Sequence, residues 1–412
     1  MFSNRTNWKL TRNRLTEALE EVRASGARVL DLTISNPTRA GLHYDQQGIL
    51  QSLASARAMD YDPQPKGLPS ARAAVAAYYR DEHGVQNFDP ERVILTTSTS
   101  EGYSFVFRLL CNAGDELLVP KPSYPLFEFL ADLQDVKLVP YPLVYDYGWQ
   151  MDLPSLEQAV TRLTRAVVVV HPNNPTGSYV HSHERGLLNR FCHEHGLALI
   201  VDEVFLDYQL DSFDDARSLH APLDRRTPVQ RLGRDDKAGS FAGNGDVLTF
   251  TLSGISKICA LPQMKVAWIA TSGPAAEAEE AQARLEVISD TYLSMNAPVQ
   301  WAVPALLEQR KSVRGQLLDR VLRNLTELDR QLAGQKMCQR LRVEGGWYAV
   351  LRVPLTQTDE ELAVDLLRRK SVLVHPGHFY DFPSEGYVVL SLITPQGEFT
   401  EGVGRLLRIA DC

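Results

Sequence analysis

The sequence predicts an α/β fold, with a large domain built on a mostly parallel seven-stranded sheet covered by helices and a smaller α+β domain after it. Three observations predict this. The chain has 412 residues, which is enough for two domains. Short apolar runs alternate with helix-length stretches between residues 93 and 271, as is typical of parallel sheets covered on both faces. After Ala297 the pattern changes to one long helical stretch followed by further short strands.

The seven strands of the large sheet are expected at the apolar runs. They are Val93–Thr97, Glu116–Pro120, Val136–Pro140, Ala166–Val170, Leu197–Asp202, Val247–Leu252 and Lys265–Thr271. The helices between them are expected at Ser100–Asn112, Tyr124–Gln134, Pro154–Arg162 and Ser182–Gly196. In sheets of this kind ligands bind outside the carboxyl ends of the strands, so the residues that follow each strand are the candidates for a functional site.

The second domain begins with a helical stretch, Val299–Leu332, that contains Pro304 and should kink or restart there. Its remaining elements are expected at Gly346–Val353, Glu360–Arg369, Ser371–His375 and Tyr387–Ile393. Residues Asp211–Asp246 are rich in Asp, Arg, Gly and Pro and lack periodicity, which predicts a long loop.

The composition excludes several classes of protein. Hydrophobic residues make up 44% and charged residues 23% of the chain, and the net charge is −8. No block of Lys and Arg indicates nucleic-acid binding. There is neither a signal peptide nor an apolar run of about 18 residues, so no membrane segment is expected. The five cysteines are scattered and form no CxxC pair, which favours a reduced, cytoplasmic protein without a disulfide framework or a bound metal.

Polar residues that carry chemistry follow three successive strands. HPNNPTG, residues 171–177, follows the first, Asp202 and Glu203 follow the second, and a Ser/Gly-rich turn holding Lys257 follows the third. An acid at a buried strand end is costly unless it meets a cation or hydrogen-bond donors. A buried acid, a lysine beside backbone donors for a phosphate, and an asparagine pair suit pyridoxal 5′-phosphate.

Seven motifs in order then establish a resemblance that covers nearly the whole chain. They are YDPQPKGLPSAR, TTSTSEGYS, PKPSYPLFE, HPNNPTG, VDEVF, SGISK with LPQMK, and VLVHPGHFYDF. With them the chain resembles the fold-type I, class I/II aminotransferases, the aspartate aminotransferase superfamily. The resemblance implies pyridoxal phosphate, transamination between an amino acid or related amine and a keto acid, and a homodimer with shared active sites. It also implies that residues 1–45 join the small domain (296–412), with residues 46–295 binding the cofactor.

The resemblance assigns three central roles. Lys257 would form a Schiff base with the cofactor's aldehyde and move the substrate's Cα proton. Asp202 would pair with the ring nitrogen, and Asn174 would donate to the 3′-oxygen. The plainer alternatives are a lysine in a surface turn, an aspartate that caps the following helix and an asparagine that only shapes a turn.

The other cofactor contacts are also implied by the resemblance. The phosphate would be bound by Thr99 and Ser100 at a helix start, by Ser253 and Ser256, and by Lys265, which stands where relatives usually have arginine. Tyr124 would stack on the ring, and Tyr61 would reach the phosphate of the neighbouring subunit. Either tyrosine could instead pack locally.

The sequence departs from the family pattern at two positions. Phe205 replaces a tyrosine that supports the 3′-oxygen, so Asn174 alone, or Tyr208, must serve, and the pKa of the Schiff base should be higher than usual. Val389 replaces the arginine that clamps the substrate carboxylate, and no arginine lies between Arg369 and Arg405.

A substrate carboxylate must then find other donors. Ser35, Asn36 and Arg39 match the segment that lines the pocket in relatives and are the candidates. The alternatives are that Arg39 is a solvated loop arginine and that the substrate presents its carboxylate differently or lacks one. Further residues in segments that border the pocket indicate aromatic walls and an imidazole donor; they are Trp347, Tyr348, His375, His378, Phe379 and Tyr380. The missing arginine leaves a β-elimination lyase or related synthase as the alternative activity. A DNA-binding regulator with this fold is disfavoured, because only about 45 residues precede the large domain.

Overall fold

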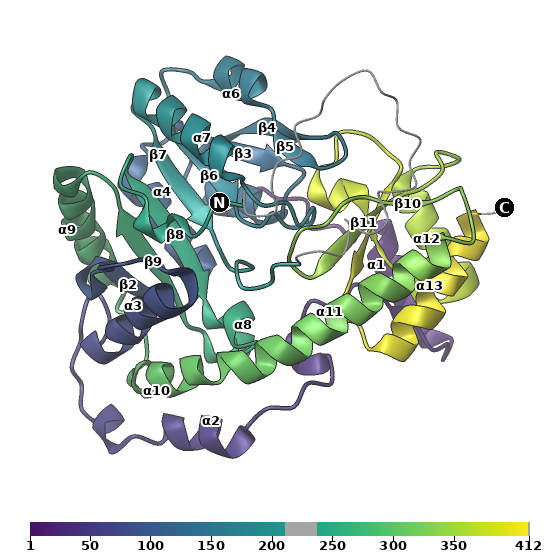
Figure 1. Ribbon diagram of the computed structural model, residues 1–412. Coiled ribbons are helices and arrows are strands. Elements are labelled where there is room, and N and C mark those ends of the chain that lie inside the picture. The colour runs from purple at the N-terminus through teal and green to yellow at the C-terminus, as the bar shows by residue number, and fades with distance from the viewer. Residues whose placement is uncertain (211–236, 411–412) are drawn as a thin grey trace.

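The computed structural model describes residues 1–210 and 237–410 (Figure 1). Its main sheet has eight strands in the order β2-β9-β8-β7-β6-β3-β4-β5. Their bounds are β2 (Val93–Thr96), β3 (Glu116–Lys121), β4 (Lys137–Tyr145), β5 (Trp149–Met151), β6 (Thr164–Val170), β7 (Ala198–Asp202), β8 (Thr249–Gly254) and β9 (Ala267–Ser272). Neighbouring strands from β4 through β8 are parallel, and β9 and β5 are antiparallel to their neighbours. The mostly parallel α/β sheet is confirmed, and the short edge strand β5 is an addition to the seven predicted strands.

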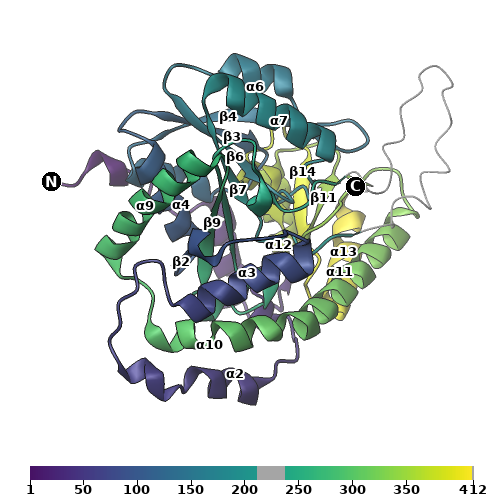
Figure 2. The same cartoon turned by 60° about the vertical axis from the view of Figure 1, so that its left-hand side comes forward.

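Helices cover both faces of this sheet (Figure 2). The helices of this region are α2 (Gln46–Leu53), α3 (Pro69–His83), α4 (Thr99–Leu110), α5 (Leu126–Leu133), α6 (Leu153–Ala159), α7 (Ser182–His195), α8 (Ile255–Ile258), α9 (Ala275–Tyr292) and α10 (Ala297–Glu308). Val168 packs in one core with residues of α4 and α9, whereas Val167 and Val169 pack in another with residues of α7. Successive side chains of a strand point to opposite faces, which explains why β6 is apolar at every position from Ala166 to Val170.

A second, antiparallel sheet has the order β10-β11-β14-β13. It is formed by β10 (Gln339–Arg340), β11 (Tyr348–Arg352), β13 (His375–Pro376) and β14 (Tyr387–Ser391), with α11 (Arg310–Leu332), α12 (Asp359–Lys370) and α13 (Gln396–Ala410) beside it. In the N-terminal segment, α1 (Arg14–Ala24) contacts α12, and β1 (Leu30–Asp31) pairs with β12 (Val372–Leu373). The N-terminal segment thus lies against C-terminal elements, while the domain boundaries at residues 45/46 and 295/296 stay a prediction.

The predicted restart of the long helical stretch does not fall at Pro304. Pro304 lies inside α10, and the break comes at Gln309, after which α11 begins. Val303 and Leu306 of α10 are fully buried, so packing outweighs the hydrogen bond that proline removes. The predicted loop Asp211–Asp246 lies largely outside the described residues.

Short 3₁₀ turns complete the described chain. They are η1 (Asn4–Thr6), η2 (Pro37–Arg39), η3 (Ala56–Met59), η4 (Pro90–Arg92), η6 (Phe241–Gly243), η7 (Pro262–Met264) and η8 (Gly377–Tyr380). Among the helices of the described ranges, none has both the length and the hydropathy needed to cross a bilayer.

Candidate active site

The three polar motifs meet at one edge of the main sheet. Strands β6, β7 and β8 are neighbours and run parallel, so their carboxyl ends lie together. HPNNPTG follows β6, Asp202 ends β7, and α8 with Lys257 follows β8. Strand β2 is parallel to β8 because both are antiparallel to β9, which brings the start of α4 to the same edge.

Lys257 places an amine in a desolvated position without a partner. Its Nζ lies 4.9 Å from the centroid of the Trp347 ring and 5.5 Å from that of Phe205. Within residues 1–210 and 237–410 it forms neither a hydrogen bond nor an ion pair. Burial lowers the pKa of Lys257 to about 8, although the charge of Asp202 acts in the opposite direction. An amine of this kind is readily deprotonated and can act as a nucleophile or a base.

Asp202 is the carboxylate whose charge acts on the Lys257 amine. Its Oδ2 accepts a hydrogen bond from the Tyr103 hydroxyl at 3.0 Å, and its Oδ1 accepts one from the Val204 N–H at 3.0 Å. Burial raises the pKa of Asp202 to about 6 in spite of these two bonds and of the nearby Lys257. The site therefore contains an acid whose negative charge would be stabilised by a cationic partner.

Tyr103 is a site residue that sequence reasoning missed, although it lies within the quoted motif TTSTSEGYS. It stands one turn into α4, whose first turn packs directly on β8: a Cβ on Gly102 would come within 2.5 Å of the Leu252 side chain. Residues four apart lie on one helix face, so a tyrosine four positions after Thr99 was the available signal.

The two asparagines of HPNNPTG have different surroundings. Asn173 is used within the turn: its Oδ1 accepts from the N–H of Thr176 at 3.2 Å and from its hydroxyl at 2.9 Å, and its Nδ2 donates to the Pro122 carbonyl. The Oδ1 of Asn174 is buried and has no hydrogen-bond partner among the described residues. A buried amide of this kind is typical of a site that completes its hydrogen bonds on a bound molecule.

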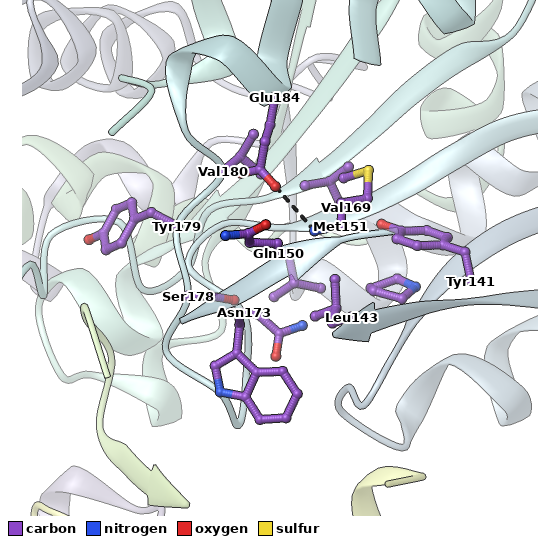
Figure 3. Close-up of a pocket in the computed structure, with 13 residues that line it drawn as sticks. Tyr141, Leu143, Gln150, Met151, Val169, Asn173, Ser178, Tyr179, Val180 and Glu184 are labelled. Carbon is purple, nitrogen blue, oxygen red and sulfur yellow. Dashed lines mark hydrogen bonds between the residues drawn. The ribbon is translucent and has the colours of Figure 1, made fainter. Parts of the chain in front are cut away.

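A small cavity lies behind this turn and is distinct from the site (Figure 3). Its lining includes Asn173, Trp149 and Ser178, and its volume is about 20 Å³. That is room for about one water molecule. Figure 3 also shows the Glu184 carboxylate accepting from the Met151 N–H, which ties α7 to β5 at the cavity rim.

The predicted phosphate residues lie around the starts of α4 and α8. Ser98 caps α4. The hydroxyls of Thr99 and Ser100 in the first turn of α4 have no hydrogen-bond partner within the described chain. The Ser256 hydroxyl in α8 also has none within these residues. The Ser253 hydroxyl instead points at the Glu203 carbonyl, 3.5 Å away.

Lys265 reaches this edge through its backbone. It follows η7 in the left-handed conformation, and the next residue, Val266, accepts a hydrogen bond from Ile255 at the start of α8. Its side chain is exposed.

The two predicted tyrosines are placed differently. Tyr124 is 47% exposed, and desolvation together with the charge of Asp202 raises its pKa. Tyr61 is 82% exposed, so one chain by itself does not bring Tyr61 to the site.

Tyr208 does not replace the hydroxyl that Phe205 lacks. The Tyr208 hydroxyl donates to the backbone carbonyl of Lys257 at 2.7 Å. The Tyr208 N–H donates to the Phe205 carbonyl, and the Tyr208 ring packs against Trp347. This hydroxyl holds the backbone that carries the lysine.

The predicted substrate residues stay on an exposed segment. The Asn36 side chain caps η2 by accepting from the N–H and the hydroxyl of Thr38, while Ser35 and Arg39 are exposed. The preceding residue, Ile34, accepts a hydrogen bond from Ser391 at the end of β14. Val389 is 1% exposed, so the position expected to hold an arginine is part of the packed core.

Residues 27–397 match the family model described as Aminotransferase class I and II. The chain belongs to this family. It is a pyridoxal-phosphate-dependent aminotransferase that transfers an amino group between an amino acid and a keto acid. The alternative of a β-elimination lyase is not favoured by these comparisons.

This aminotransferase is 28% identical to the alanine aminotransferase of Mycobacterium tuberculosis over 396 residues, which is 93% of this chain and 86% of the relative. It is 26% identical to the glutamate-pyruvate aminotransferase AlaA of Haemophilus influenzae, over 93% of this chain and 91% of the relative. The solved structure of an alanine aminotransferase from Pyrococcus furiosus has the same fold, with a TM-score of 0.86, 20% identity and 100% coverage of both chains.

Proposed function

We propose that Lys257 is the residue that holds pyridoxal phosphate and moves the substrate proton in this aminotransferase. The observation that carries the proposal is a desolvated amine with no partner within the described chain, placed beside Asp202, with the pKa of Lys257 lowered to about 8. When bound, the cofactor supplies an aldehyde for covalent attachment and a ring that takes up the electrons released at the substrate's Cα.

The residues around Lys257 fit this group. Asp202, fixed by Tyr103 and the Val204 N–H, would hold the proton at the ring nitrogen. Asn174, whose Oδ1 has no partner among the described residues, would turn its amide so that Nδ2 donates to the 3′-oxygen. Tyr124 would cover one face of the ring and exclude water from it.

The phosphate would lie where α4 and α8 begin. The N–H groups and hydroxyls of Thr99 and Ser100 at the start of α4 suit an anion. Ser256 and Lys265 would add a donor and a positive charge, and Ser253 would be a weaker contact because its hydroxyl points at a carbonyl. Tyr61, which is exposed in one chain, would complete the neighbouring subunit's site in a homodimer.

The proposed donor is a small neutral α-amino acid, with alanine as the first to be tested, because the relatives named above are alanine and glutamate-pyruvate aminotransferases. The scattered cysteines, which form no CxxC pair, support a cytoplasmic location.

The test is borohydride reduction of the cofactor-loaded protein, followed by peptide mass mapping. We expect the cofactor's mass on the Lys257 peptide. The Lys257→Ala protein should carry no such label, and its rate of transamination should fall by at least about 10³-fold. Lys137→Ala, which removes an exposed lysine on β4, is the control and should keep both. A label that remained on the Lys257→Ala protein, together with turnover, would show that another residue carries the cofactor.

A further inference from the structure

The part of the small sheet around Val389 offers no free cation for a substrate carboxylate among the described residues, because Lys121, Arg39 and Arg352 are each either paired or exposed. Lys121, three residues before Tyr124, forms an ion pair with Asp381 at 3.1 Å. The guanidinium of Arg352 lies 5.9 Å from the ring centroids of both Tyr145 and Tyr387. Arg39 is exposed on η2. The wall itself is the β11–β14–β13 part of the small sheet, where Val389 lies between Val350 and His375.

Three side chains with hydrogen-bonding groups lie on or beside the strands that flank Val389. The His375 Nδ1 is 2.9 Å from the Tyr380 hydroxyl, and His375 stands directly across from Val389 in the β13–β14 ladder. Tyr348 is on β11, two positions from Val350 and on the same face. His375 and Tyr348 therefore lie on two sides of the packed valine.

These three side chains are connected to the site around Lys257. The Tyr348 ring packs edge-on to Phe205, with 6.2 Å between centroids, and Phe205 lies beneath the Lys257 amine. The backbone N–H of Ser123 donates to the Tyr380 carbonyl at 2.9 Å, which fixes η8 against the segment that carries Tyr124. Tyr348 is thus linked to Lys257 through Phe205, and Tyr380 is linked through Ser123 to the segment that carries Tyr124.

In either tautomer of His375, the His375–Tyr380 pair keeps one N–H or O–H that is not used between the two side chains and can donate to a ligand. If Tyr380 donates to Nδ1, the imidazole carries its proton on Nε2; if Nδ1 donates, the Tyr380 hydroxyl is free to donate. Burial raises the pKa values of Tyr348 and Tyr380 and lowers the pKa of His375. All three groups are therefore neutral near pH 7 and keep their donors.

We propose that His375, Tyr380 and Tyr348 form a neutral wall that holds the substrate's α-carboxylate by hydrogen bonds, in place of a guanidinium. The proposal rests on the proposed function, because it takes an α-amino acid to be bound at Lys257. It makes these residues determinants of specificity: neutral donors favour a carboxylate over an uncharged carboxamide less strongly than a guanidinium does.

The experiment measures carboxylate binding separately from chemistry. Propionate, a carboxylate without an amine, is titrated into the cofactor-loaded protein and followed by the cofactor's absorbance, and KM and kcat are measured with alanine and alaninamide. Tyr380→Phe and Tyr348→Phe should each raise the propionate Kd and the alanine KM about tenfold, the effect of one lost hydrogen bond to a charged group, and change kcat less than about threefold. Alaninamide should be used within about tenfold of alanine.

The control is Tyr141→Phe, because the Tyr141 hydroxyl donates to the Val168 carbonyl inside the main sheet; it should leave the propionate Kd unchanged. A rise in Kd for Arg39→Ala with none for either tyrosine variant would overturn the proposal in favour of an arginine site. Use of amines without a carboxylate in preference to alanine would overturn it as well. The label on the Lys257 peptide, measured in the same preparations, separates this failure from failure of the proposed function.

Discussion

Asp202 ends β7 and Asp207 follows five residues later, and both are buried carboxylates, but their surroundings are opposite. Asp202 is held by two neutral donors, and the amine of Lys257 near it is unpaired within the described chain. Asp207 accepts from the Tyr78 hydroxyl at 2.9 Å and lies 3.0 Å from the His83 imidazole, with the Arg314 guanidinium 4.0 Å away.

The second cluster continues into a bridge between helices, which we call the Asp207 clasp. Its members are Tyr78, Glu82, His83, Asp207, Arg310 and Arg314. Glu82 on α3 binds Arg310 at 2.8 Å and Arg314 at 3.0 Å. Helix α3 covers the main sheet and α11 runs toward the small sheet (Figure 1), so the clasp joins the two regions.

The difference teaches how to separate a functional cluster from a structural one. Removing one partner of a buried ion pair leaves an uncompensated charge and is strongly destabilising. In the clasp each charged group faces a group of opposite charge, although Asp207 Oδ2 and Arg310 Nε have no hydrogen-bond partner among the described residues. We therefore expect the clasp to contribute to stability. Charged groups that are desolvated and unpaired have shifted pKa values, as Asp202 and Lys257 do, and such shifts are typical of functional sites.

The largest effect expected from this comparison is for Asp202→Asn. The amide cannot hold a proton at the cofactor's ring nitrogen, so transamination should fall about 10²–10³-fold. The pKa of Lys257 should also fall further below its usual value, since the charge of Asp202 raises it. Steady-state kinetics of the cofactor-loaded protein measures the first effect and a pH titration the second.

Asp207→Asn is the matched control for that substitution. It removes the same charge a few residues away and should lower the free energy of unfolding while kcat per loaded site stays within about threefold of wild type. An equal loss of activity in the two variants would show that the paired cluster also serves catalysis and would break the comparison.

The next largest effect is expected for Glu82→Gln, which removes the counter-ion of two arginines. The side chains of Glu82 and Arg310 are only 12% and 7% exposed, so the free energy of unfolding should fall by about 2 kcal/mol, between the values for exposed and fully buried pairs. Urea unfolding followed by circular dichroism measures it. An unchanged free energy of unfolding would show that the clasp contributes no more to stability than exposed surface ion pairs do.

The pH dependence of the Glu82→Gln difference checks its cause. Desolvation raises the pKa of Glu82, but hydrogen bonds from Arg310 and Arg314 more than offset it, so the net pKa lies below the usual value. A lowered carboxylate pKa gives stability that is present above the unfolded-state pKa of about 4.3 and is lost as the pH falls through the folded-state value. The two proteins should therefore converge in stability below about pH 4.

The smallest effect is expected for Tyr103→Phe, which sharpens the comparison. Burial raises the pKa of Asp202 to about 6, and the Tyr103 hydroxyl opposes this rise. Without it the pKa should rise further, and Asp202 should be protonated over a wider range below neutral pH. The cofactor-free protein should bind pyridoxal phosphate about tenfold more weakly near pH 6, as measured by absorbance titration. Tyr78→Phe, the same change in the clasp, should leave this affinity unaltered.

The sequence by itself determined the parts of this protein that depend on local pattern. Seven strands of the main sheet and the order of the motifs could be predicted, because a buried strand is an apolar run and the residues after it are polar. Asp202 and Lys257 could be proposed as neighbours since both follow adjacent parallel strands, and their roles stay predictions. Strand β5 was missed because three residues carry too little periodicity.

Only the tertiary structure decided which side chains meet across long separations in the chain. Tyr103 reaches Asp202, Tyr208 donates to the Lys257 carbonyl, and His375 pairs with Tyr380 beside a buried Val389. The sequence gives no distance between such residues. The packing of α3, α4 and α11 fixes which charged groups have partners of opposite charge. This pairing distinguishes the candidate active site from the Asp207 clasp, because a desolvated charge is stable only where an opposite charge or hydrogen-bond donors compensate it.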